Sequence, residues 1–153
     1  DLPAVEAVLD QLHEAASKAD GDSYFKVFHS SAVFIGTAQT ERWNLQQLKV
    51  YANRFFSKGQ GWTSIPHARH VAVAPNGQVA WFDESLTNET LGNIRGSGAL
   101  IKENGSWKLS HYVLSFPIPN HLIKKVLPIL KEQEATPPKM PPQTAPSNKD
   151  YRL

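Results

Sequence analysis

The second half of the chain contains four long segments with the sequence pattern of β-strands, and these segments restrict the fold more than any other feature. They cover residues 62–74, 78–88, 93–103 and 106–116. Asn-Gly pairs at residues 76–77 and 104–105 fall between them, where tight hairpins need residues that tolerate a positive φ. The pattern therefore predicts an antiparallel meander of strands long enough to twist and coil.

The third of these segments is rich in glycine, which gives the sheet places to bend. Gly92, Gly96 and Gly98 lie in or beside it, and glycine in a strand often marks a bulge or a sharp bend. A sheet that bends has a concave face. We expect this face to enclose a pocket once helices cover it.

Residues 1–60 carry the helical patterns that can cover such a face. Apolar residues recur at helical spacing over residues 4–18, and Asp22 or Ser23 is expected to cap a second, short helix. Residues 32–36 are typical of a strand and residues 37–42 of a loop. Asn44 is expected to cap a third helix that ends near residue 57. The predicted fold class is therefore α+β, with helices first and the meander second.

The C-terminal part has a different composition. An apolar segment over residues 122–130, interrupted by Pro128, predicts a short, kinked helix within residues 121–135. Residues 136–153 are rich in proline and polar residues, which is typical of an extended or disordered tail. We therefore expect a pocket domain over residues 1–120, then the short helix, then the tail.

Composition excludes several classes of partner and chemistry. The apolar fraction of 41% and the lack of a membrane-length apolar run predict a soluble protein that binds no membrane. The dispersed charges, with a net charge of +2, argue against nucleic acid as a partner. The absence of cysteine excludes disulfides and thiolate catalysis. A start at Asp1 without methionine favours a periplasmic or secreted protein, with a cytoplasmic one as the alternative.

Several stretches resemble the SnoaL-like branch of the nuclear transport factor 2-like superfamily, which is also called ketosteroid isomerase-like. They are Ala-Trp-Phe-Asp-Glu at 80–84, Arg-Gly-Ser-Gly-Ala-Leu-Ile at 95–101, Trp-Lys-Leu at 107–109 and His-Tyr-Val-Leu-Ser-Phe-Pro-Ile-Pro-Asn at 111–120. The resemblance covers about residues 4 to 120. It implies a cone-shaped, curved antiparallel sheet around the N-terminal helices, a cystatin-like α+β barrel roll. It also implies frequent homodimerisation through the outer sheet face and a pocket whose chemistry varies among relatives.

The second strand of the meander carries two adjacent carboxylates that must point to opposite faces, since side chains alternate along a strand. Trp81 and Asp83 share one row, and Glu84 belongs to the other. An acid beside an aromatic ring in a partly dry pocket has its charged form disfavoured, which suits a general base. Asp83 is thus the first catalytic candidate, and Trp81 is a ligand contact. The alternative is a cross-strand ion pair of either carboxylate with Arg69 or Arg95.

The last strand supplies the second catalytic candidate. His111 and Ser115 share a row with Trp107, the pattern of a pocket wall with polar groups. His111 is expected to move a proton and Ser115 to contact the ligand. The alternative is a histidine buried in the core with satisfied hydrogen bonds.

Four residues complete the predicted site. Arg95 could clamp a ligand carboxylate or fix Asp83, or it could form a salt bridge at the surface or in a dimer. Tyr112 could stabilise negative charge that develops on a substrate. Tyr24 and Tyr51 lie on the predicted helices, where aromatic residues form either core or pocket wall.

No cofactor and no metal are expected. His67 and His70 are three residues apart on a predicted strand and therefore face opposite sides. The sequence also lacks a glycine-rich phosphate loop before a helix and a Gly-x-Ser-x-Gly motif. Nucleotide binding and serine hydrolysis thus have no support.

Three functions stay open. The first is a binding module for a small apolar or carbonyl-bearing molecule. The second is a cofactor-independent isomerase, cyclase or dehydratase, in which Asp83 or His111 transfers a proton while Arg95 or Tyr112 stabilises charge. The third is an assembly module, in which the outer sheet face and the proline-rich tail bind a second copy or another partner.

Overall fold

The computed structural model describes residues 1–135, with side chains to residue 132, and the predicted tail at 136–153 lies outside the described residues. The chain divides into a compact unit, Asp1–Pro117, and a smaller unit that starts at Ile118. The helices of the first unit are α1 (Leu2–Ser17), α2 (Gly21–Lys26) and α3 (Leu45–Phe56). Its strands are β1 (Phe28–Ile35), β2 (Arg42–Asn44), β3 (Ser64–Val73), β4 (Val79–Asn88), β5 (Gly92–Glu103) and β6 (Ser106–Ser115).

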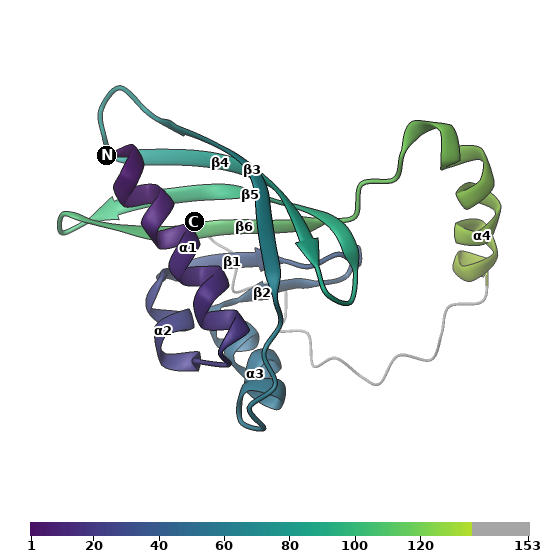
Figure 1. The fold of residues 1–153 in the computed structure, drawn as a ribbon, viewed down its shortest axis with the longest axis horizontal. Coiled ribbons are helices and arrows are strands. Elements are labelled where there is room, and N and C mark those ends of the chain that lie inside the picture. The colour runs from purple at the N-terminus through teal and green to yellow at the C-terminus, as the bar shows by residue number, and fades with distance from the viewer. Residues whose placement is uncertain (136–153) are drawn as a thin grey trace. The chain divides into compact units, whose positions relative to one another are not determined.

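Six strands form one curved, unclosed sheet in the order β2-β1-β6-β5-β4-β3 (Figure 1). The last four strands pair antiparallel in sequence order, as the meander pattern predicts. β1 joins the other edge of the meander and runs parallel to β6. This pairing extends β1 back to Phe28, four residues before the predicted start, and the short strand β2, which was not predicted, begins at the last residue of the predicted loop.

The helix ends show which local signals were correct. The side chain of Asn44 accepts from the backbone N–H of Gln47, and the side-chain oxygen of Gln47 accepts from the backbone N–H of Asn44, which confirms the predicted cap of α3. The prediction that Asp22 or Ser23 caps α2 is wrong. Asp20 is the capping residue, because its carboxylate accepts from the N–H of Ser23 at 3.0 Å.

The turns confirm the two predicted Asn-Gly hairpins. Gly77 has a φ of 67° between β3 and β4, and Asn104 and Gly105 have φ of 50° and 79° between β5 and β6. Positive φ at these positions is what tight hairpin turns require.

β6 contains one extra residue, and this changes which of its side chains face the core. Ala99 pairs with His111 and Leu100 pairs with Leu109, so Ser110 has no residue opposite it on β5. Such a bulge reverses the alternation of side chains along the strand. Leu109 before the bulge and Tyr112 after it are therefore both buried.

The core lies between the concave side of the sheet and the helices, and α1 crosses the strands on that side (Figure 1). Val5 and Leu9 of α1 are fully buried, as are Ala80 and Leu100 of the sheet. Each fully buried valine or leucine side chain contributes about 1.5–3 kcal/mol to folding. The confirmed fold class is thus α+β, with the helices over a curved sheet.

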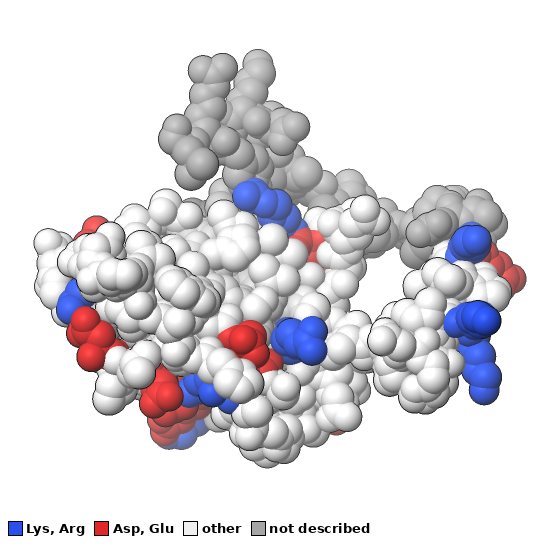
Figure 2. Space-filling model, turned by 90° about the horizontal axis from the view of Figure 1, so that it is seen from above, with Lys and Arg blue, Asp and Glu red and all other residues white. Residues whose placement is uncertain are grey.

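The smaller unit consists of a 3-10 turn, η1 (Asn120–Leu122), and helix α4 (Ile123–Ala135) with Pro128 inside it. No helix among residues 1–135 combines the length and the apolar character needed to cross a membrane. Acidic and basic side chains lie scattered among one another on the face shown in Figure 2, as the even charge balance of the sequence leads one to expect.

Candidate functional site

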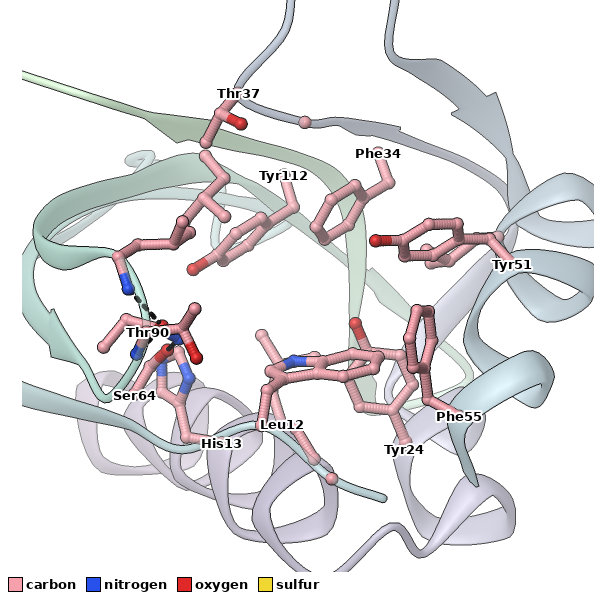
Figure 3. Close-up of a pocket in the computed structure, with 18 of the residues that line it drawn as sticks. Leu12, His13, Tyr24, Phe34, Thr37, Tyr51, Phe55, Ser64, Thr90 and Tyr112 are labelled. Carbon is pink, nitrogen blue, oxygen red and sulfur yellow. Dashed lines mark hydrogen bonds between the residues drawn. The ribbon is translucent and has the colours of Figure 1, made fainter. Parts of the chain in front are cut away.

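A cavity of about 520 Å³ opens between the concave side of the sheet and the three helices of the first unit. Aromatic side chains dominate its wall, and Figure 3 shows several of them turned toward one another around the open space. They are Tyr24, Phe34, Trp43, Tyr51, Phe55, Trp62 and Tyr112. A volume of this size is typical of sites for small organic ligands.

His13 is the polar group of α1 that lines this cavity, and it is paired with a buried acid. Its Nε2 lies 2.6 Å from Oε1 of Glu84, and the two side chains are 12% and 0% exposed. Within residues 1–135, Nδ1 of His13 has no hydrogen-bond partner and is not among the fully buried atoms. Nδ1 is therefore the ring nitrogen without a protein partner among these residues, on a side chain that lines the cavity.

Arg69 holds the Glu84 carboxylate from the other side. Its Nε donates to Oε2 of Glu84 at 2.9 Å, and one terminal nitrogen donates to Asp10 at 2.7 Å. Burial by itself raises the pKa of Glu84, but the hydrogen bonds and charges of His13 and Arg69 outweigh it and leave the pKa below its usual value. Glu84 is thus an ionised carboxylate behind an imidazole.

Tyr112 completes the set of groups around Glu84. Its hydroxyl donates to Oε1 at 3.3 Å, and burial followed by the Glu84 charge raises the pKa of Tyr112. Gly96 leaves the space for this arrangement, because a Cβ there would collide with the Tyr112 hydroxyl and crowd Oε1 of Glu84. The Arg-Gly-Ser-Gly strand therefore matters to the site through its first glycine.

The prediction that the row of Trp81 and Asp83 faces the pocket is wrong. The buried residues of β4 are those of the other row, which includes Glu84, and Trp81 is 51% exposed. Asp83 is exposed and contacts His70 at 3.1 Å on the outer face. The alternative of a cross-strand ion pair holds for Glu84, with Arg69 as its partner.

The bulge in β6 also removes two other candidates from the cavity. It turns His111 and Ser115 away from the side that Tyr112 occupies, so neither lines the cavity. Ser115 donates a hydrogen bond to the backbone carbonyl of Arg95, and Arg95 itself is exposed. A clamp of Arg95 on a pocket ligand or on Asp83 has no support in this geometry.

Three predicted ligand contacts do line the cavity, namely Tyr24, Tyr51 and Tyr112. His13 was not predicted from the sequence as a site residue, and Glu84 was predicted only as an ion-pair partner. A signal for both was present: Glu84 stands in a row with Ala80, Phe82 and Leu86, and a charged residue in an otherwise apolar row needs a buried partner. Residues 1–135 contain no cluster of ligands suited to a metal ion.

Comparison with known proteins agrees with this architecture. A solved NTF2-like protein of unknown function from Pseudomonas putida has a TM-score of 0.65 and 11% identity, covering 76% of this chain and 86% of that chain. A protein of unknown function with a cystatin-like fold from Nostoc punctiforme has a TM-score of 0.60 and 16% identity, covering 80% and 96%. A candidate dehydratase of the NTF2-like family from Streptomyces avermitilis has a TM-score of 0.66 and 10% identity, covering 77% and 97%.

At these identities, the similarity to solved structures concerns the fold alone. No curated protein matches the sequence significantly. The sequence model of the SnoaL-like domain family matches residues 5–119, which is most of the chain and includes every residue around the cavity. The chain therefore belongs to the SnoaL-like domain family.

Proposed function

We propose that the first unit binds a small, flat and largely apolar molecule in its cavity. The observation that carries this proposal is the set of aromatic rings around an open volume of about 520 Å³. Aromatic walls favour planar ligands, because ring faces and edges pack well against other rings at low entropic cost. A few polar groups at one end then fix the orientation of the ligand.

We also propose proton transfer as a second function of the same cavity, because His13 is oriented as a base. With Glu84 accepting from Nε2–H, the lone pair of Nδ1 is left to take a proton from a substrate. The imidazolium that forms is stabilised by the adjacent carboxylate, and it can return the proton to another atom of the same substrate. The candidate dehydratase among the structural neighbours performs, by its name, a reaction of this general type.

Tyr112 does not act as the charge-stabilising group that the sequence led us to expect. Its hydroxyl proton is directed to Glu84, so it orients the acid and is not available to a substrate oxygen. We therefore propose as substrate a compound in which a carbonyl group makes the neighbouring C–H bond acidic, such as an enolisable cyclic ketone.

Binding is tested first, with naphthalene and 2-naphthol as probes and tryptophan fluorescence as the readout, since Trp43 and Trp62 line the cavity. We expect saturable quenching by both, with 2-naphthol tighter because its hydroxyl can donate to Nδ1 of His13. The variant His13→Gln should lose that difference. Failure of both compounds to quench saturably contradicts the binding proposal.

Proton transfer is tested by hydrogen–deuterium exchange at the carbon next to the carbonyl of 1-tetralone, followed by proton NMR in D₂O. The wild-type protein should accelerate exchange by roughly 10²-fold or more, within the range typical of positioned bases. His13→Gln should return the rate to that of the buffer. His70→Gln is the matched control, since His70 pairs with Asp83 on the outer face. Equal rates for His13→Gln and the wild type rule out this second function.

We further propose that two copies of the chain associate through the outer sheet face. Trp81 is 51% exposed and Val79 is 37% exposed on that face, next to each other in one row of β4. Exposed apolar side chains that cluster on a sheet commonly mark an interface.

A further inference from the structure

The charged groups that line the cavity are acids. Glu41 and Glu89 belong to its wall, and the wall contains no lysine and no arginine among residues 1–135. Arg69 lies behind Glu84 and is already paired with two carboxylates. A cavity with this lining repels an anionic ligand and attracts a cationic one.

Among the residues that the structure describes, neither Glu89 nor Glu41 has a cationic partner, and Glu41 is the one whose charge acts on Tyr51. Within residues 1–135, no lysine, arginine or histidine forms an ion pair with Glu41. Its carboxyl group lies against Gly36, where a Cβ would collide with it, so its position is fixed by the end of β1. Burial raises the pKa of Glu41 despite a backbone hydrogen bond at Ala38. A positive charge on a ligand would offset the energetic cost that burial imposes on the ionised carboxylate.

Aromatic rings form the part of the cavity wall next to Glu41. The Tyr51 phenol is near enough that the Glu41 charge, after the larger effect of burial, raises its pKa. Trp43 stacks on Tyr51 with 4.6 Å between the ring centroids, and Phe55 packs its edge toward Tyr51 at 5.5 Å. Tyr51 and Phe55 are each 38% exposed, so a ligand can reach them, and Figure 3 shows both at the same end of the cavity.

Electron-rich rings around an unpaired carboxylate are the arrangement that binds organic cations. The ring faces attract an ammonium group, most strongly for tryptophan and tyrosine and when water is excluded. The carboxylate adds a charge interaction that a neutral ligand cannot use. A substituted ammonium has the further advantage that its alkyl groups match the apolar surroundings.

We propose that the ligand of this cavity carries a positively charged alkylammonium group, which binds between Glu41 and the rings of Trp43 and Tyr51. This inference rests on the proposed binding function and specifies the chemical class of its ligand. The flat apolar body of the ligand then extends toward His13 at the other end of the cavity.

The test compares three probes of similar shape and different charge by tryptophan fluorescence and calorimetry. Benzyltrimethylammonium is the cation, neopentylbenzene is its neutral carbon isostere, and 4-tert-butylbenzoate is the anion. The cation should bind roughly 10-fold tighter than the neutral isostere, from cation–π attraction and the Glu41 charge together. The anion should bind most weakly.

Variants assign the preference to its residues. Glu41→Gln keeps the shape of the side chain and should reduce cation affinity about 5-fold while leaving the neutral isostere unchanged. Tyr51→Leu should reduce the same preference by removing a ring. Glu103→Gln is the matched control, because Glu103 lies outside the cavity wall and contacts His29. It should behave as the wild type.

The outcomes separate the two proposals. If the neutral isostere binds as tightly as the cation, or if the anion binds best, the inference about charge is wrong and the pocket proposal stands. The same holds if Glu41→Gln and Tyr51→Leu leave the preference unchanged. If neither these probes nor naphthalene binds, both proposals are wrong.

Discussion

Asp83 and Glu84 are neighbours in the chain and have opposite environments. Glu84 is fully buried and accepts hydrogen bonds from His13, Arg69 and Tyr112, whereas Asp83 is 59% exposed and contacts His70. The same chemical group is thus part of a fixed network on the concave face and a weakly held surface charge on the outer face. The comparison shows that the face of the sheet, and not the residue type, decides how the carboxylate is held.

The difference has an energetic reason. A buried carboxylate without partners costs several kcal/mol, so the concave face can hold Glu84 only because α1 and β3 bring donors to it. An exposed carboxylate is hydrated already, and an ion pair there contributes about 0–1 kcal/mol. The outer face therefore accommodates Asp83 at little energetic cost.

The largest expected effect is the loss of the buried acid. Glu84→Ala should lower the free energy of unfolding by about 3–5 kcal/mol, because it leaves the buried Arg69 without its main partner. Asp83→Ala should change it by less than about 0.5 kcal/mol. Urea unfolding followed by tryptophan fluorescence measures both. Similar values for the two variants would contradict the asymmetry between the faces.

A smaller effect is expected from filling the space beside Tyr112. Gly96→Ala should destabilise the protein by about 1–3 kcal/mol, because the added methyl group overlaps the Tyr112 hydroxyl. Ser97→Ala, the next residue of β5, should have little effect. The double variant Gly96→Ala with Tyr112→Phe should recover part of the loss, since the oxygen is gone. No recovery in thermal unfolding would show that the strain lies elsewhere.

The pH dependence of stability should reveal the buried acid Glu84. The folded-state pKa of Glu84 is lowered, so its stabilising contribution is present above the unfolded value of about 4.3 and is lost as the pH falls through the folded value. Wild-type stability should therefore decrease below about pH 4.3. Glu84→Gln should flatten this acid limb, because it removes the carboxylate whose pKa folding lowers. Unfolding measured at several acid pH values provides the comparison.

The smallest effect on folding, with a visible effect on assembly, is expected at the outer face. Trp81→Lys replaces an exposed ring and should change the free energy of unfolding by less than about 0.5 kcal/mol. It should shift the sedimentation coefficient from dimer toward monomer if copies associate through this face. Val50→Lys on α3, which is also exposed, is the control. A wild-type protein that sediments as a monomer at all concentrations contradicts the proposed association.

The sequence by itself determined most of the secondary structure, because the signals for it are local. Asn44 caps α3 through a residue three positions along the chain, and Gly77 and Gly105 adopt the positive φ that their turns need. The four long segments show the strand pattern within their own residues. The family resemblance rests on the same local stretches. These features depend on residues that are close in the chain.

Only the tertiary structure decided which strand rows face inward and which residues form the site. The alternating pattern of β4 does not say which of its two rows of side chains faces the core. In β6, the unpaired Ser110 changes which side chains after it face the core. His13 meets Glu84 across 71 residues of sequence, since α1 packs over the concave face. The physical reason is that the period of two in a strand fixes which side chains share a row. Which of the two rows faces inward is decided by the packing of elements that are distant in the sequence.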